Sequence, residues 1–181
     1  DRDVTGVQTC ALPISCTTAL HTVLEVIGVK GKEVIVPDYT YPATAEAVIL
    51  AGGTPVLVDV DFESMNITSE ILENAHDEKM NVFIPVSWGG VPLEPEIYKT
   101  GKKLGLFNLE DAACSLGSMI GDQKVGKLAD ATCFSFHPRK VITTGEGGMV
   151  TTDNDEIAEK CHSFKHFGME NGRFVSIGTN Y

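Results

Sequence analysis

The feature that most constrains the fold of this sequence is a regular alternation of short apolar runs with segments of helical periodicity. In residues 20–27 the apolar side chains recur at i, i+3, i+4 and i+7, which predicts one face of a helix, and Gly28 ends it. Residues 34–36 form a continuous apolar run that Pro37 closes, as in a strand buried on both faces. Repeated along the chain, this alternation predicts a three-layer α/β sandwich in which helices cover both faces of a mostly parallel sheet.

The remaining elements follow from the same two periodicities. Helices are predicted over residues 42–51 and 95–104 and after a cap at Asp153 or Asn154, and Ser69 is expected to cap a further short helix. Strands are predicted over residues 55–60, 82–86, 106–109, 131–136 and 148–152, with a hairpin over 118–125 that turns at Gly121–Asp122. No repeat or low-complexity tract interrupts the pattern, so one domain is expected from Ser15 onward.

Charge and cysteine content restrict the partners of the chain. The net charge is −11 and the acidic residues are dispersed, which argues against a nucleic-acid or anionic-membrane surface. No apolar run approaches the roughly 20 residues that a membrane helix needs. The five cysteines include no C-x-x-C pair, so neither a disulfide framework nor a metal site is expected. Together these features predict a cytoplasmic protein.

The first residues do not share the pattern of the rest. Residues 4–14 resemble the conceptual translation of a common sequencing-library adapter, and they join abruptly to the helix start at Ser15. We therefore predict that residues 1–14 are a translation artefact and that native sequence begins at about Ser15. A native N-terminal loop is the alternative, and genomic reads across the join would distinguish the two.

Small hydroxylated residues open the first predicted helix, in the run Ser15-Cys16-Thr17-Thr18. The unbonded N–H groups and the positive end of the helix dipole then point to one spot, which is an arrangement that binds phosphate. Taken alone, the run is more often a simple helix cap formed by Ser15 or Thr17.

An acid and a lysine follow two of the predicted strands. Glu110–Asp111 ends one strand, and the small residues Ala112–Ala113 behind it leave room for a flat ring. Lys140 stands on a glycine-rich loop after Ser135, where loss of solvation would make its amine nucleophilic. Either residue alone is more often solvated. Because ligands of such sheets collect at the carboxyl ends of strands, the combination predicts one shared site.

A second glycine-rich segment suggests a different chemistry. Residues 121–127 nearly match the phosphate loop G-x-x-x-x-G-K-[ST], but Leu128 replaces the metal-binding hydroxyl residue. The segment also reads as a hairpin and not as a strand-to-helix turn. A nucleotide-hydrolysing loop is therefore a rival hypothesis that magnesium-dependent nucleotide binding would test.

With these motifs in place, the sequence from Ser15 to Tyr181 resembles the pyridoxal-phosphate (PLP) dependent sugar aminotransferases of the DegT/DnrJ/EryC1/StrS family, and most closely its perosamine-synthase type. The resemblance rests on six segments that occur in the family's order and spacing: residues 15–21, 34–37, 43–45, 110–113, 135–140 and 145–148. It implies the large domain of an aspartate-aminotransferase-like enzyme (PLP fold type I), with the C-terminal domain missing, and a homodimer when complete.

The resemblance also implies roles for individual residues. Lys140 would bind PLP covalently and move the proton during transfer, and Asp111 would hold the pyridinium nitrogen. Tyr41 would stack on the ring, and Cys114 takes a position where the family often has Gln, Glu or His. The remaining cofactor contacts would all be made to phosphate: by Thr17, Thr18 and Ser135 in the same subunit, and by Asn180 to the phosphate of the neighbouring subunit.

The implied reaction moves an amino group, commonly from glutamate, to a keto carbon of a nucleotide-linked sugar in amino-sugar or surface-polysaccharide biosynthesis. We expect little or no activity from the 181-residue chain alone. Two alternatives stay open. One is a PLP-dependent sugar dehydratase of the same family, against which Lys140 argues because histidine replaces the lysine there. The other is a binding or regulatory domain that keeps the fold without the chemistry.

Overall fold

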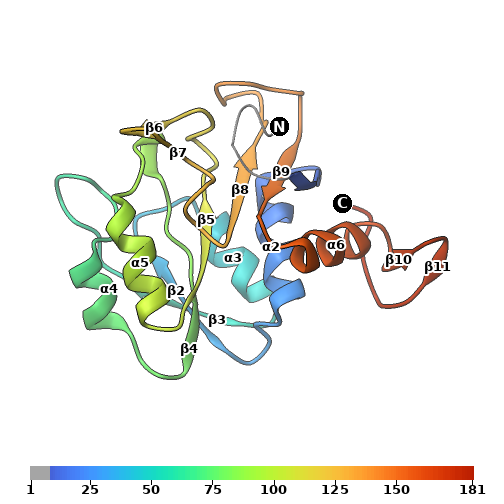
Figure 1. The fold of residues 1–181 in the computed structure, drawn as a ribbon, viewed down its shortest axis with the longest axis horizontal. Coiled ribbons are helices and arrows are strands. Elements are labelled where there is room, and N and C mark those ends of the chain that lie inside the picture. Colours follow the sequence, from blue (N-terminus) through green and yellow to red (C-terminus); the bar gives the residue numbers. More distant parts are fainter. Residues whose placement is uncertain (1–8) are drawn as a thin grey trace.

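The computed structural model describes residues 9–181, and they form a seven-stranded sheet between two layers of helices (Figure 1). From one edge to the other, the strands are β1 (Thr9–Ala11), β9 (Gly148–Thr151), β8 (Ala131–Ser135), β5 (Phe107–Asp111), β4 (Met80–Phe83), β2 (Glu33–Pro37) and β3 (Thr54–Val58). The run from β8 to β3 is parallel, whereas β9 pairs antiparallel with both β8 and β1. The predicted three-layer sandwich with a mostly parallel sheet is confirmed.

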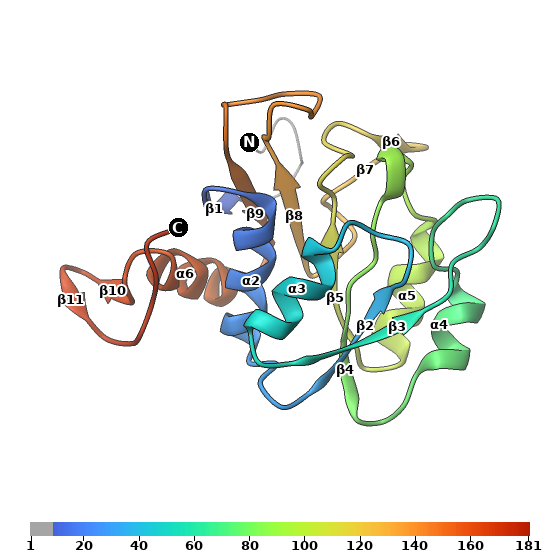
Figure 2. The ribbon, with the colours of Figure 1, turned by 180° about the vertical axis from the view of Figure 1, so that it is seen from behind.

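Helices cover each face of this sheet, as Figures 1 and 2 show from opposite sides. The helices are α2 (Cys16–Ile27), α3 (Ala43–Leu50), α4 (Ser69–Ala75), α5 (Pro95–Lys103) and α6 (Asp155–Phe164). Side chains of α2 and α3 form one core with the sheet, and Cys161 of α6 joins it. Those of α4 and α5 form a second core on the other face with Ile35 and Phe83. The strand β2, which is buried on both faces, contains the unbroken apolar run from which it was predicted.

Helix ends follow local capping rules. Ser15 caps α2, since its side chain accepts a hydrogen bond from the Thr18 N–H, and Gly28 ends the helix in a left-handed conformation at φ 72°. Asn154 caps α6, one of the two predicted residues. The prediction for α4 was wrong by one residue, because the hydroxyl of Thr68, and not that of Ser69, accepts the Ile71 N–H.

Three small elements complete the chain. The hairpin of β6 (Met119–Ile120) and β7 (Gln123–Lys124) turns at Gly121–Asp122 as predicted. A short 3-10 turn, η1, covers Trp88–Gly90, and a second hairpin of β10 (Met169–Glu170) and β11 (Arg173–Phe174) projects from the body beyond α6 (Figure 1). Neither of the last two was predicted. None of the described helices is long and apolar enough to cross a membrane.

The N-terminal edge of the sheet comes from the segment predicted to be an artefact. Residues 1–8 of that segment lie outside the described part of the chain. Thr9 lies opposite Thr151 and Ala11 opposite Val150, and Ala11 is buried in the core. The segment therefore pairs with β9 in this fold. Its origin as adapter sequence is not a question of fold and stays a prediction.

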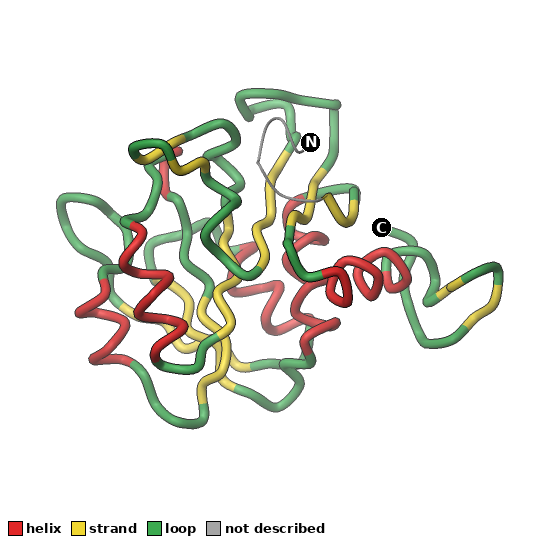
Figure 3. The backbone as a smooth tube through the Cα atoms, in the orientation of Figure 1, coloured by secondary structure: helices red, strands yellow, loops and turns green. Residues whose placement is uncertain are grey.

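Loops rather than helices collect at the carboxyl ends of the parallel strands. The tube in Figure 3 shows the loop segments after β5 and β8 at the same edge of the sheet. Residues 112–118 follow β5, and residues 136–147 connect β8 to β9. Because parallel strands end on a common edge, these loops and the start of α2 meet there.

Candidate active site

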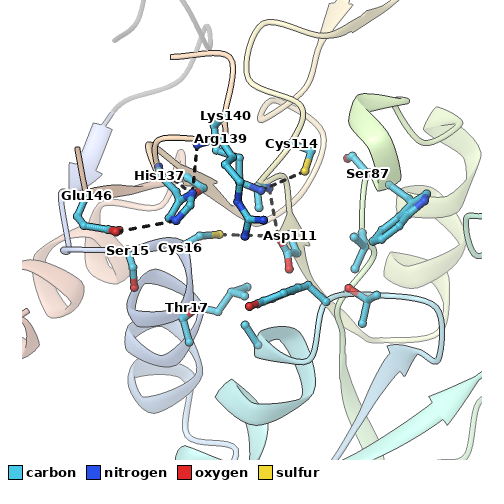
Figure 4. Close-up of a pocket in the computed structure, with 18 residues that line it drawn as sticks. Ser15, Cys16, Thr17, Ser87, Asp111, Cys114, His137, Arg139, Lys140 and Glu146 are labelled. Carbon is cyan, nitrogen blue, oxygen red and sulfur yellow. Dashed lines mark hydrogen bonds and ion pairs between the residues drawn. The ribbon is translucent and has the colours of Figure 1, made fainter. Parts of the chain in front are cut away.

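A pocket of about 540 Å³ lies at this loop-rich edge of the sheet (Figure 4). Its wall comes from the start of α2, the loops after β4, β5 and β8, and the start of α3. Six of the eight predicted site residues line it, namely Thr17, Tyr41, Asp111, Cys114, Ser135 and Lys140. The structure therefore brings together side chains that are distant in sequence.

Asp111 provides the buried acid of the pocket. It is the last residue of β5 and only 6% exposed. One carboxylate oxygen accepts a hydrogen bond from Thr44 Oγ1 at 2.8 Å, and the other accepts from Ala113 N at 3.1 Å and from Cys16 Sγ at 3.7 Å. Burial raises the pKa of Asp111, while these hydrogen bonds and the charge of Lys140 act in the opposite direction. The carboxylate is thus fixed in orientation and partly shielded from water.

Lys140 enters the pocket from the loop after β8. A tight turn over residues 137–140 carries it, in which Lys140 N donates to the carbonyl oxygen of His137 at 2.9 Å and Pro138 restricts the backbone. Its amine donates to Cys114 Sγ at 3.2 Å. The side chain is half-buried, and Figure 4 shows it pointing into the pocket from the side opposite α2.

The start of α2 forms the hydroxyl-rich end of the pocket. Ser15, Cys16 and Thr17 line it, and the hydroxyl of the buried Ser135 faces the same space from the end of β8. The backbone N–H groups of the first helical turn add partial positive charge at this end. Hydroxyls and a helix N-terminus together are a suitable donor set for a phosphate group.

Close contact between two backbones holds the start of α2 in place. Ser15 forms a parallel bridge with Gly147, and the adjacent Gly148 approaches so closely that an added Cβ would lie 2.2 Å from the Ser15 carbonyl oxygen. Glycine at position 148 is therefore required by space and not by its backbone angles. This contact ties the hydroxyl-rich start of α2 to the strand that follows the Lys140 loop.

The other two predicted site residues lie outside the pocket wall. Thr18 belongs to the cap of α2, since its hydroxyl accepts from Ser15 N at 3.0 Å and donates to the Ser15 carbonyl oxygen at 2.9 Å. Asn180 is exposed near the C-terminus, where its backbone forms an isolated antiparallel bridge with His166. A direct phosphate contact from Thr18, and one from Asn180 to a second subunit, stay predictions.

Several pocket residues were missed by sequence reasoning. Trp88 follows β4 as Asp111 ends β5, and its ring lies 4.7 Å from that of Tyr39, measured between centroids. The same strand-end argument that selected Asp111 would have selected it. Thr44 lies behind the pocket wall in one of the six resemblance segments, but its hydrogen bond to the Asp111 carboxylate, 67 positions away in the chain, was not predicted. Arg139 also lines the pocket and was passed over beside Lys140.

The residues present fit PLP, the cofactor that the sequence resemblance implies. That molecule carries a phosphate, a ring nitrogen that is basic, and an aldehyde that condenses with an amine. The pocket offers, in turn, the hydroxyl-rich helix start, the buried Asp111 carboxylate and the Lys140 amine. Ala113 leaves the space between them clear of bulk.

Comparisons with known proteins agree with this geometry. The model of the DegT/DnrJ/EryC1/StrS aminotransferase family matches residues 2–181. GDP-perosamine synthase from Caulobacter vibrioides is 38% identical over 184 residues, which cover 99% of this chain and 50% of that protein. The chain thus spans about half the length of this relative.

Solved structures give the same result. The Helicobacter pylori protein PseC, an aminotransferase involved in the biosynthesis of pseudoaminic acid, superposes with a TM-score of 0.93 at 33% identity, over 99% of this chain and 51% of PseC. NtdA from Bacillus subtilis, with bound cofactor PMP, superposes with a TM-score of 0.88 at 30% identity, over 97% of this chain and 41% of NtdA.

Proposed function

Because the chain belongs to the DegT/DnrJ/EryC1/StrS aminotransferase family, we propose that it is the cofactor-binding part of an enzyme that transfers an amino group to a nucleotide-linked keto sugar. PLP is the cofactor. The observation that carries the proposal is the convergence of Lys140 and Asp111 on one pocket beside the hydroxyl-rich start of a helix. The names of GDP-perosamine synthase and of PseC support a sugar as the acceptor, and the PMP bound to NtdA supports the cofactor.

The two central residues have different tasks. PLP, when bound, supplies an electron sink for the carbon that loses or gains a proton during transfer. The Asp111 carboxylate keeps a proton on the ring nitrogen by charge and by hydrogen bonding, which the contacts from Thr44 and Ala113 support because they orient it. The Lys140 amine holds the cofactor at rest and then moves a proton at the reacting carbon as general base and acid.

The pocket walls position the cofactor for that chemistry. Thr17 and Ser135 bind its phosphate through their hydroxyls, with the N–H groups of α2 behind them. Tyr41 stacks on the ring, for which its 68% exposure leaves the aromatic face available. Cys114 contacts the amine of Lys140 and so shares the space beside the reacting carbon.

The wider context belongs to the same proposal. Glutamate is the amino donor, the product serves amino-sugar or surface-polysaccharide synthesis, and the complete enzyme is a cytoplasmic homodimer in which Asn180 reaches the partner's phosphate. Catalysis is a property of the whole polypeptide, since this chain spans about half of its relatives.

Spectroscopy of the protein expressed at the full length of its relatives tests the proposal. Incubation with PLP should produce the visible absorbance band of a lysine-bound cofactor. Lys140→Ala should abolish that band while the circular dichroism spectrum is unchanged. Lys99→Ala is the matched control, because Lys99 is 71% exposed and, within residues 9–181, its ion pair is with Glu96 on the same helix. A band that survives in Lys140→Ala would place the linkage on another lysine, and no band in the wild type would indicate a domain without this chemistry.

A further inference from the structure

The turn that carries Lys140 also directs a second cation toward the pocket. Lys140 N donates to the His137 carbonyl oxygen at 2.9 Å, and Arg139 N donates to His137 Nδ1 at 3.2 Å. Two hydrogen bonds to one residue, together with Pro138, fix the backbone of this turn. The guanidinium of Arg139 and the amine of Lys140 therefore leave adjacent positions of a restrained segment, and both line the pocket (Figure 4).

The charge of Arg139 is not used by the protein itself. Within residues 9–181 its guanidinium forms no ion pair. The acids of the pocket have other partners, since Glu146 lies 4.0 Å from His137 Nε2 and the Asp111 carboxylate accepts from Thr44, Ala113 and Cys16. Arg139 is exposed and lines the pocket. A fork of N–H donors is thus available to an anion that enters.

We propose that Arg139 binds the carboxylate next to the amino group of the amino-acid donor. The inference rests on the proposed function and extends it to donor selection. In any α-amino acid the nitrogen and the carboxylate are attached to the same carbon. When that nitrogen occupies the place of the Lys140 amine, the carboxylate lies within a few bonds of it, in the same pocket that the Arg139 side chain lines. A guanidinium matches a carboxylate in two parallel hydrogen bonds.

The same geometry separates the two substrates of a transaminase. A keto sugar carries no carboxylate beside its reacting carbon, so it offers Arg139 no partner at that point. In the proposed function the phosphate of the cofactor has its own partners, Thr17 and Ser135, which line the same pocket. Arg139 therefore acts in the half of the reaction that takes nitrogen from the amino acid and releases the 2-oxo acid. It is not needed in the half that delivers nitrogen to the sugar.

Single-turnover kinetics on the full-length holoenzyme test this assignment. Arg139→Gln should slow the half-reaction with L-glutamate by about ten- to a hundredfold, the usual effect of losing a charge-assisted hydrogen bond. With 4-aminobutyrate, which lacks the carboxylate beside its amine, wild type and variant should react equally. The half-reaction with the keto sugar should also keep its wild-type rate, and Arg139→Lys should recover part of the loss. Lys99→Gln, which removes one exposed charge from α5, should change neither half-reaction.

A binding measurement checks the same contact without turnover. By calorimetry, glutarate, a dicarboxylate without an amine, should bind the holoenzyme about tenfold more weakly in Arg139→Gln than in wild type. An equal loss with L-glutamate and 4-aminobutyrate, or a loss confined to the sugar half-reaction, would overturn the proposal. These measurements require a holoenzyme that shows the PLP absorbance band. If the band is absent, the proposed function is refuted. If the band is present but Arg139→Gln leaves the glutamate half-reaction unchanged, only the present inference is refuted.

Discussion

At the scale of single residues, Glu110 shows that the position of an acid in a strand decides which face of the sheet it occupies and whether it is buried. It precedes Asp111 in β5, so its side chain points to the opposite face of the sheet. There it is completely buried and accepts hydrogen bonds from the hydroxyl groups of Ser87 and, at 3.5 Å, Thr132. Burial raises the pKa of Glu110, against the effect of hydrogen bonds from Ser87 and Tyr98. Ser87 also lines the pocket, so this network lies directly behind its wall.

The raised pKa of Glu110 predicts a pH effect on stability. The folded chain holds this proton more tightly than the unfolded chain, so the contribution is complete below the unfolded value of about 4.5 and is lost as pH rises through the folded pKa. Glu110→Gln keeps the shape and removes the titration. Urea titrations at several pH values should therefore show a flatter decline of unfolding free energy above pH 4.5 in the variant than in wild type. Parallel curves would show that Glu110 does not titrate in this range.

The sequence predicted the chemical residues of the site better than the residues around them. Lys140 and Asp111 were found because a motif and a strand end mark them. Thr44 and Ser87 were not, since their importance comes from contacts to residues 67 and 23 positions away in the chain. Thr18 shows the reverse case. Its position suggested a ligand contact, but its hydroxyl forms hydrogen bonds with the backbone N–H and the carbonyl oxygen of Ser15 at the helix cap.

At the scale of elements, the junction of α2 and β9 holds the hydroxyl-rich end of the pocket, where we propose that the phosphate binds. Gly148→Ala should force Ser15 away from β9, because the new Cβ would lie 2.2 Å from the Ser15 carbonyl oxygen. We expect a loss of about 1–3 kcal/mol in unfolding free energy, the usual cost of overpacking, together with weaker PLP binding. Thermal unfolding and a PLP titration of the full-length protein would measure both.

A glycine outside this junction supplies the control. Gly121, in the β6–β7 turn, has no atom within 4 Å of an added Cβ, although its φ of 55° is left-handed. Gly121→Ala should therefore cost stability through backbone strain alone and leave the PLP affinity unchanged. If Gly148→Ala bound PLP as tightly as Gly121→Ala, the junction would not control the phosphate site.

Helices and strands were predictable where their apolar side chains repeat over enough residues to show a helical or strand pattern. The helices and most central strands show such apolar patterns, and the structure has them close to the predicted bounds, although β4 lies at Met80–Phe83 and was predicted over 82–86. β10 and β11 are two residues each and show no period at all. The cap of α4 differed by one residue, because Thr68 and Ser69 are both good capping residues and only the backbone angles decide between them.

At the scale of the whole molecule, the described chain exposes unusually large apolar side chains. Among the most exposed are Leu57 on the edge strand β3, Phe62 in the following loop, and Ile177 after the β10–β11 hairpin, at 60%, 85% and 93%. Apolar groups at a free sheet edge commonly mark surfaces that other protein covers. The relatives are about twice as long as this chain, so they have further sequence to cover such surfaces.

We therefore expect the 181-residue chain on its own to self-associate and to show little or no transamination. Light scattering over a range of concentrations should give a mass that rises with concentration, whereas the full-length protein should give one defined assembly. Steady amination of a keto sugar by the purified chain, or a monomer at all concentrations, would contradict this expectation.

The pairing of β1 with β9 has a consequence for how the protein is made. The ribosome delivers Ser15 early, but its neighbours Gly147 and Gly148 emerge only after most of the sheet has been synthesised. Until then the start of α2 has no wall on that side. We therefore expect the cofactor to bind only after β9 has been made, because a nascent chain that stalls before β9 has Asp111 and Lys140 but lacks the contact that holds the start of α2.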